Sequence, residues 1–272
     1  AIRLTAFNLT TTIGRDLIME SGSNRNLSFS NTAASALNVT VNGNLINNSN
    51  RTLNINGTTT TNTLNLRGDL TIASTGLLTA AFATNFNFIG SGDGSSADTT
   101  QTIDIASTGA NENQNLNFRV INGTAASYVK LINQDLELGT NSTFTVNSGN
   151  TLDFGFNGAY STLTNTSAGT TGLEIKEVPA TATGTGFTAN GGSILKITSA
   201  AGMMLAGADS GNVRTDNRIY TPGASTYHYV GRANQATGTH FTNSTNSKII
   251  ICDLDTSALT LTLSVPTGVS SV

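Results

Sequence analysis

The chain has 272 residues, a net charge of −3 and a pI near 5.3, and only 11% of its residues are charged. Ordinary globular domains carry about 25% charged residues; here Thr, Asn, Ser and Gly take their place. The 13 Lys and Arg are scattered singly, which excludes a groove that tracks nucleic-acid phosphates. No apolar stretch is long enough to span a bilayer, and the single cysteine, Cys252, excludes a disulfide framework.

A short unit recurs through the first 155 residues, in which apolar and polar residues alternate and the run ends at Gly or Asn. Examples are Leu53-Asn-Ile-Asn-Gly57, Leu64-Asn-Leu-Arg-Gly68 and Leu116-Asn-Phe-Arg-Val-Ile-Asn-Gly123. The period of two predicts short strands with one face inward, and Gly or Asn suits the turns between them. We expect these side chains to point into a core: Leu53, Ile55, Leu64, Leu66, Leu70, Ile72, Ile103, Ile105, Leu116 and Phe118.

Helix is almost excluded, because no segment keeps apolar residues at i, i+3, i+4 and i+7. Two kinds of all-β fold remain. Sandwich strands are longer and recur at regular spacing, whereas solenoids use very short strands with a turn on every side of each coil. The sequence therefore predicts an all-β, right-handed parallel β-helix with about 20–25 residues per coil. An array of β-sandwich modules is the alternative.

Composition and strand spacing suggest three parts. Residues 1–157 are predicted to form the solenoid repeats, and residues 158–217 an irregular continuation or linker, because the connections lengthen there. Residues 218–272 show a different pattern and are predicted to form a C-terminal β repeat module. The first residues look like the middle of a strand, so we interpret the chain as cut from a longer protein.

The third part begins with a strand that includes Tyr227-His-Tyr-Val-Gly231, followed by the turn Gln235-Ala-Thr-Gly-Thr239 and the strand Leu259-Thr-Leu-Thr-Leu263. This block resembles the repeat modules of very large surface proteins of the Bacteroidetes, and the upstream Leu-x-Ile-x-x-x-Gly strands fit the same proteins. The resemblance implies a secreted, cell-surface adhesin used in attachment or gliding and exported by the type IX secretion system. Its implied partners are a surface polysaccharide or solid surface and, during export, the secretion translocon.

Polysaccharide-acting enzymes built on β-helices are the first functional alternative. Glycoside hydrolysis needs two carboxylates roughly 5–9.5 Å apart, and stacked coils would bring Asp104 near Asp135, or Asp135 near Asp153. Acids at outward strand positions are more commonly part of a solvated face, so we expect no enzyme activity. A third alternative is that the segment matters only as cargo of a secretion machine.

The remaining candidates are weaker. His228 and His240, with Asp253 or Asp255, lack close metal-ligand spacing, and Cys252 closes an apolar run that predicts a buried, inert thiol. Asp93 and Asp98 lie in a Gly-rich stretch that matches no calcium loop. The absence of Trp and a content of 6% aromatic residues argue against an aromatic sugar-binding platform, and Tyr220, Tyr227 and Tyr229 are the aromatic residues to inspect for one. We therefore predict no catalytic, cofactor-binding or metal-binding residues and no cofactor.

Overall fold

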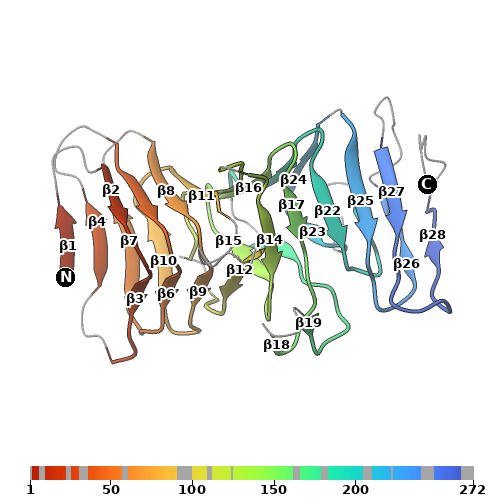
Figure 1. Ribbon diagram of the computed structural model, residues 1–272, viewed down its shortest axis with the longest axis horizontal. Helices are drawn as coiled ribbons and strands as arrows, with labels where there is room; N and C mark the ends of the chain where they lie inside the picture. Colours follow the sequence, from red (N-terminus) through yellow and green to blue (C-terminus); the bar gives the residue numbers. More distant parts are fainter. Residues whose placement is uncertain are drawn as a thin grey trace.

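The computed structural model is a parallel β-helix, in which short strands stack along the long axis of the molecule (Figure 1). The structure describes residues 2–5, 10–22, 26–30, 36–56, 61–90, 100–108, 112–123, 125–161, 166–178, 183–204, 210–221, 223–239 and 248–264. All regular elements in these ranges are strands. The fold class predicted from the period of two is confirmed, and the handedness of the coil stays a prediction.

One side of the coil is an eight-stranded parallel sheet. Its strands are, in order, β2 (Thr10–Ile13), β5 (Asn38–Val41), β8 (Asn62–Leu66), β11 (Thr84–Phe88), β13 (Leu116–Val120), β16 (Thr143–Val146), β21 (Gly186–Ala189) and β24 (Asn217–Tyr220). Each strand is two to five positions away in chain order from its neighbour, because the chain visits the other sides before it returns. Every pairing in this sheet is parallel.

A second side is a nine-stranded parallel sheet. It runs from β3 (Leu17–Met19) through β6 (Leu45–Asn47), β9 (Leu70–Ile72), β12 (Thr100–Ile105), β14 (Tyr128–Leu131), β17 (Thr151–Asp153), β22 (Ile194–Ile197) and β25 (Ser225–Tyr229) to β27 (Lys248–Cys252). With strands stacked about 4.8 Å apart, this sheet sets the length of the rod.

Within the described ranges the third side is interrupted. Four strands form its first part: β1 (Ile2–Thr5), β4 (Leu27–Ser30), β7 (Thr52–Asn56) and β10 (Leu77–Ala80). Three form the second, β15 (Leu136–Leu138), β20 (Ile175–Glu177) and β23 (Val213–Arg214), and two the last, β26 (Gln235–Ala236) and β28 (Leu261–Thr262). Between β10 and β15 the chain turns through Asn113 and Asn115, which have φ values of 49° and 56°. This left-handed backbone, which Asn tolerates, cannot continue a strand.

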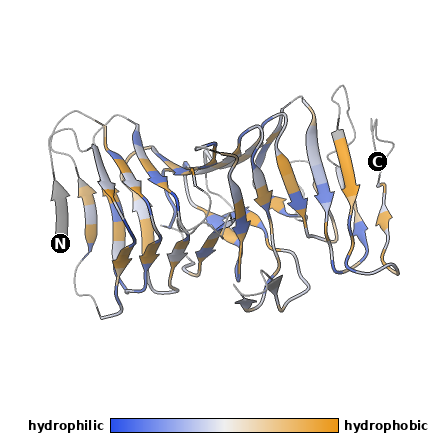
Figure 2. Ribbon diagram, in the orientation of Figure 1, coloured by the Kyte–Doolittle hydropathy of each residue, from blue (hydrophilic) through white to orange (hydrophobic). Residues whose placement is uncertain are grey.

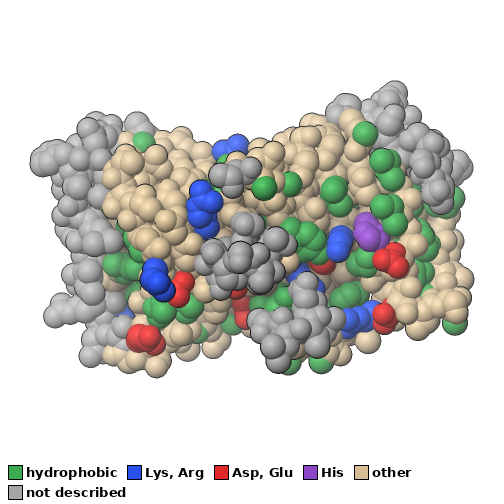
Figure 3. Space-filling view, viewed as in Figure 1, with side chains coloured by type: hydrophobic (Ala, Val, Ile, Leu, Met, Phe, Trp, Pro, Cys, Tyr) green, Lys and Arg blue, Asp and Glu red, His purple; other side chains and the backbone are tan. Residues whose placement is uncertain are grey.

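The core is a stack of apolar side chains enclosed by the three sides. Hydrophobic and hydrophilic residues alternate along the strands in Figure 2, as expected for one face inward and one outward. All ten side chains predicted to point inward, from Leu53 to Phe118, are buried, with at most 3% exposure. Figure 3 shows that few charged side chains interrupt the visible surface.

The coils differ in length. The predicted 20–25 residues fits only some of them, since in-register partners are 22 residues apart between β8 and β11 but 43 apart between β16 and β21. The longest coil contains a small antiparallel hairpin, β18 (Tyr160–Ser161) with β19 (Thr166–Ser167). Extra residues therefore leave the coil at its corners, and the parallel ladder continues unchanged on either side.

The two long sheets run across both of the predicted part boundaries. β17 lies before residue 158 and pairs with β22, and β21 pairs with β24, which spans residue 218. β22 in turn pairs with β25, and β25 with β27. In the described residues the C-terminal block is therefore hydrogen-bonded to the same stack, and its assignment as a distinct repeat module stays a prediction.

Candidate functional site: a polar groove beside the interrupted side

The three carboxylates considered for glycoside hydrolysis have three different partners. Asp104, on the outward face of β12, accepts a hydrogen bond from Asn133 Nδ2 at 2.6 Å. Asp153 accepts one from the Tyr128 hydroxyl at 2.6 Å, and Asp135 accepts one from the Lys176 ammonium at 3.0 Å. Among the described residues no hydrogen bond joins any two of these acids, so the ladder places each beside a different polar group.

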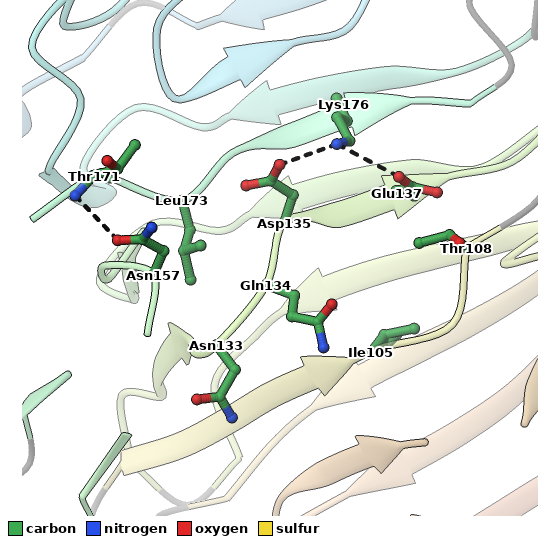
Figure 4. A pocket seen from close by; sticks show the side chains of 11 residues that line it. Ile105, Thr108, Asn133, Gln134, Asp135, Glu137, Asn157, Thr171, Leu173 and Lys176 are labelled. Carbon is green, nitrogen blue, oxygen red and sulfur yellow. Dashed lines mark hydrogen bonds and ion pairs between the residues drawn. The ribbon is translucent and has the colours of Figure 1, made fainter. Parts of the chain in front are cut away.

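A groove of about 290 Å³ lies where the nine-stranded sheet turns toward the third side, next to the interruption. We call it the junction groove. Its polar lining includes Asn133, Gln134, Asp135, Glu137, Asn157 and Lys176. Ile105 and Leu173 supply an apolar part of the wall, and Figure 4 shows Gln134 between the Lys176 cluster and Asn133. The lining is therefore mostly polar, whereas most small-molecule sites are lined chiefly by apolar and aromatic side chains.

Lys176 organises one wall of the junction groove. Its Nζ lies 3.0 Å from Asp135 Oδ2 and 3.4 Å from Glu137 Oε1. Burial alone would lower the pKa of Lys176, but the hydrogen bonds and negative charges of Asp135 and Glu137 outweigh it and raise that pKa. The ammonium therefore stays charged, and it holds both carboxylates on one side of the groove (Figure 4).

The opposite wall depends on Asn133. Its side chain donates to Asp104 and accepts from the backbone N–H of Tyr160 at 3.1 Å, which ties the β18–β19 hairpin to the sheet. Burial raises the pKa of Asp104, against the smaller opposing effect of the Asn133 hydrogen bond. Asn157 accepts from the Thr171 N–H at 3.1 Å and fixes the base of the hairpin.

A further acid lies beside this groove. Glu112, in the irregular segment that interrupts the third side, is 5% exposed. Burial raises its pKa; a hydrogen bond with Ser107 lowers it, and the charge of Glu137 raises it further. Glu112 thus has a neighbouring carboxylate that favours its protonated form.

A second polar cluster covers the outer face of the nine-stranded sheet. Lys130, Asp153 and Lys196 are in register on adjacent strands. Burial lowers the pKa of Lys130; Asp153 opposes this effect, and Lys196 and Arg232 add to it. Arg232 donates to the backbone oxygens of Ser167 at 2.7 Å and Gly169 at 2.5 Å. The cluster therefore fastens the hairpin insertion onto the sheet.

The aromatic and thiol candidates have other roles. Tyr227 and Tyr229 are 2% and 0% exposed, and the Tyr229 hydroxyl donates to Thr237 O at 2.8 Å. They belong to the core and form no sugar platform. The prediction of a buried Cys252 is wrong, since this thiol is exposed. It shares the inward parity of Ile250 but ends β27, the last strand of its sheet, so no further described strand covers it.

One pair of the metal candidates lies close together. His228 Nε2 lies 3.4 Å from Asp253 Oδ2, whereas His240, Asp93 and Asp98 lie outside the described residues. No group of three or more His, Cys, Asp or Glu side chains suited to a metal ion occurs within the described ranges. In the same ranges no helix is long and apolar enough to cross a membrane.

Of the groove residues, sequence reasoning identified Asp135 alone as a site candidate and placed Ile105 in the core. Gln134, Glu137 and Lys176 were missed because they come from different coils of unequal length, with Asp135 and Lys176 separated by 41 residues. The sequence does contain a signal for these two groove residues, because Glu137 and Lys176 are charged residues in a chain with few charges. Glu137 stands at the outward position of a Leu-x-Leu strand and Lys176 at that of an Ile-x-Glu strand. Comparison with known protein families, curated proteins and solved structures finds no match to this chain.

Proposed function

We propose that this chain is a rigid, non-catalytic spacer segment of a secreted bacterial surface adhesin, used in attachment or gliding. The supporting observation is the unbroken nine-stranded ladder from β3 to β27, around which coils of different length all keep the same register. A stack of this kind fixes the separation of its two ends, which is what a stalk must do.

Export by the type IX system and contact with a surface polysaccharide or solid surface belong to the same proposal. They are supported by the resemblance of the C-terminal block to Bacteroidetes surface repeats and by the Thr- and Asn-rich composition of the chain. The non-catalytic part is supported by the carboxylates, since Asp104, Asp135 and Asp153 each bind a separate polar group.

Rigidity is tested with two spin labels in the nine-stranded sheet. Cys252 is exposed and takes one label directly; Ile18→Cys, at an exposed position of β3, takes the other. Eight strand spacings of about 4.8 Å give an expected separation of roughly 38 Å, plus the reach of the labels. Pulsed electron paramagnetic resonance should show one narrow distance distribution. A broad or bimodal distribution would contradict the spacer role.

The absence of catalysis is tested on neutral and acidic polysaccharides. We expect the protein to release neither reducing ends nor unsaturated products. Turnover that disappears in Asp104→Asn, Asp135→Asn or Asp153→Asn would overturn the non-catalytic assignment in favour of a polysaccharide-acting enzyme.

A further inference from the structure

Residues 112–115, which we call the bridging segment, cross the interruption of the third side between β10 and β15. The backbone N–H of Asn113 donates to a carbonyl oxygen of β10 at 2.9 Å, and its side-chain Nδ2 donates to Glu137 O of β15 at 2.8 Å. The backbone of Glu112 approaches the following coil so closely that a Cβ on Gly139 would clash with the Glu112 carbonyl oxygen. Glu112 therefore lies on the coil next to Glu137.

The side chains at this contact lack hydrogen-bond donors. Glu112 Oε2, Asn113 Oδ1 and Glu137 Oε2 are all buried and have no hydrogen-bond partner in the described part of the chain. All three atoms are acceptors when the two carboxyl groups are ionised, and the Asn113 amide nitrogen already donates to Glu137 O. Buried polar atoms are normally paired, so the contact is short of at least one donor.

A proton on Glu112 supplies that donor and needs no cavity, because a protonated carboxyl group has one O–H to donate. Burial raises the pKa of Glu112, the Ser107 hydroxyl opposes this effect, and the negative charge of Glu137 adds to it. A metal cation is the poorer solution, because the Lys176 ammonium already lies 3.4 Å from Glu137 Oε1 and repels it (Figure 4).

The other charged groups near the bridging segment have partners of their own. β10 and residues 106–111 contain no titratable side chain. Lys176 of β20 pairs with Glu137 and with Asp135, and Asp104 of β12 accepts from an amide nitrogen. Among the described residues, Glu137 is therefore the charged group that acts on Glu112.

We propose that Glu112 is a pH-sensitive switch, whose protonated carboxyl group holds the bridging segment against β15 and whose ionisation releases it. The closed segment binds the proton more tightly than an open, solvated one. The closed form is therefore favoured most below 4.5, the ordinary pKa of a glutamate, and loses this advantage as the pH rises through the raised pKa of Glu112. The two long sheets do not pass through the bridging segment and stay intact. The proposal goes beyond the spacer role and does not rest on it.

Amide hydrogen exchange in the whole chain, followed by NMR at several pH values, measures the opening. After correction for the exchange rate of an unprotected amide, the protection of Asn113 and Asn115 should fall above pH 4.5. The fall should reach up to about tenfold per pH unit, since one proton is lost, and end once the pH passes the raised pKa. The amide of Phe118, in the eight-stranded sheet, should show no such dependence.

Glu112→Gln should keep the segment protected at every pH, because its amide cannot ionise and still donates a hydrogen bond. Glu20→Gln, at an exposed glutamate, is the matched control and should keep the pH dependence of the wild type. The ¹³C resonance of the Glu112 carboxyl group reports its protonation directly in the unmodified protein, so the test does not depend on the folding of a variant.

The proposal is overturned if the Glu112 carboxyl group titrates at or below 4.5, or if the protection of Asn113 does not depend on pH. It is also overturned if Glu112→Gln keeps the pH dependence of the wild type, or if calcium and EDTA, rather than pH, change the protection. The spin-label distance is unaffected by any of these outcomes, so the spacer role fails or stands separately.

Discussion

Phenylalanine side chains form a continuous column inside the eight-stranded sheet. Phe118 lies between Phe86 and Phe144, with ring centroids 5.5 and 6.2 Å away, and Phe144 continues to Phe187 at 6.2 Å. Register requires this, because Phe86, Phe118, Phe144 and Phe187 are Cα partners on successive strands. The rings therefore connect four coils of the core through direct contact.

Phe118→Ala should destabilise the protein by about 3–5 kcal/mol, because the residue is fully buried. The substitution leaves a cavity between the two neighbouring coils, and these coils cannot both move in to fill it. Denaturant unfolding measures the change. Thr145→Ala, at an outward position of the same sheet, is the control and should cost well under 1 kcal/mol. A loss below about 1 kcal/mol for Phe118→Ala would mean that the core is not close-packed there.

Asp104 gives the stability a predictable pH dependence. Burial raises its pKa in the folded state above the ordinary value of 3.8. The folded protein therefore favours the protonated acid, and its contribution to stability is present below that value and is lost as the pH rises through the raised pKa.

Asp104→Asn removes this ionisation and retains an oxygen that accepts from Asn133. The variant should be more stable than the wild type at pH 7, and the difference should shrink toward zero as the pH falls below about 4. Urea unfolding at several pH values measures it. Asp216→Asn, at an exposed carboxylate, controls for the loss of one negative charge. A wild type that is the more stable of the two at pH 7 would contradict the direction of the pKa change.

Among the elements, the corner between the eight- and nine-stranded sheets requires glycine. Gly43, Gly68, Gly90 and Gly123 occupy this corner in successive coils. A Cβ on Gly90 would lie 2.6 Å from Arg67 Cα, and one on Gly123 would meet the carbonyl oxygen of Ile89. The repeated glycines in the sequence therefore mark where the backbone of one coil touches the backbone of the next.

Gly90→Ala should cost about 1–3 kcal/mol, since the clash is with backbone and the stacked coils must separate to relieve it. Gly14→Ala provides the comparison, because nothing lies within 4 Å of its Cβ and the residue is exposed. That change should be neutral or slightly stabilising. Thermal melting of both variants tests the prediction, and equal melting temperatures would refute the close approach.

The strands could be predicted from the sequence because each is a local pattern. Leu64 and Leu66 alternate with polar residues within one run, and both are buried. The interruption of the third side could not be predicted, since Asn also fills ordinary turns and nothing local marks Asn113 and Asn115 as left-handed. The junction groove was missed for a similar reason, because coils of unequal length hide which residues become neighbours.

For the whole molecule, the coil is a modular unit whose length sets the register. Val41 and Leu66 are Cα partners, as are Ile46 and Thr71, so this coil advances by 25 residues on both long sheets. Deleting residues 42–66 joins equivalent points and brings Gly68 to the place of Gly43. Deleting residues 42–65 instead shifts every following residue by one position and turns inward side chains outward.

The 25-residue deletion should therefore fold, with a β-type circular dichroism spectrum and a cooperative melting transition, whereas the 24-residue deletion should aggregate or unfold. Analytical ultracentrifugation and thermal melting distinguish the two. If both deletions behave alike, the register along the rod is not set by the core.

The orientation of the hydrogen bonds has a mechanical consequence. The strands run across the rod, so their interstrand bonds lie along its axis (Figure 1). Tension applied to the two ends would therefore break the interstrand hydrogen bonds of the outermost coil first and then those of the next coil. The hydrogen bonds of the whole stack would not be sheared together. Each 25-residue coil that unfolds would then release roughly 85 Å of extended chain, at about 3.4 Å per residue. In the proposed stalk, such coils would lengthen stepwise under load and recoil when the load falls.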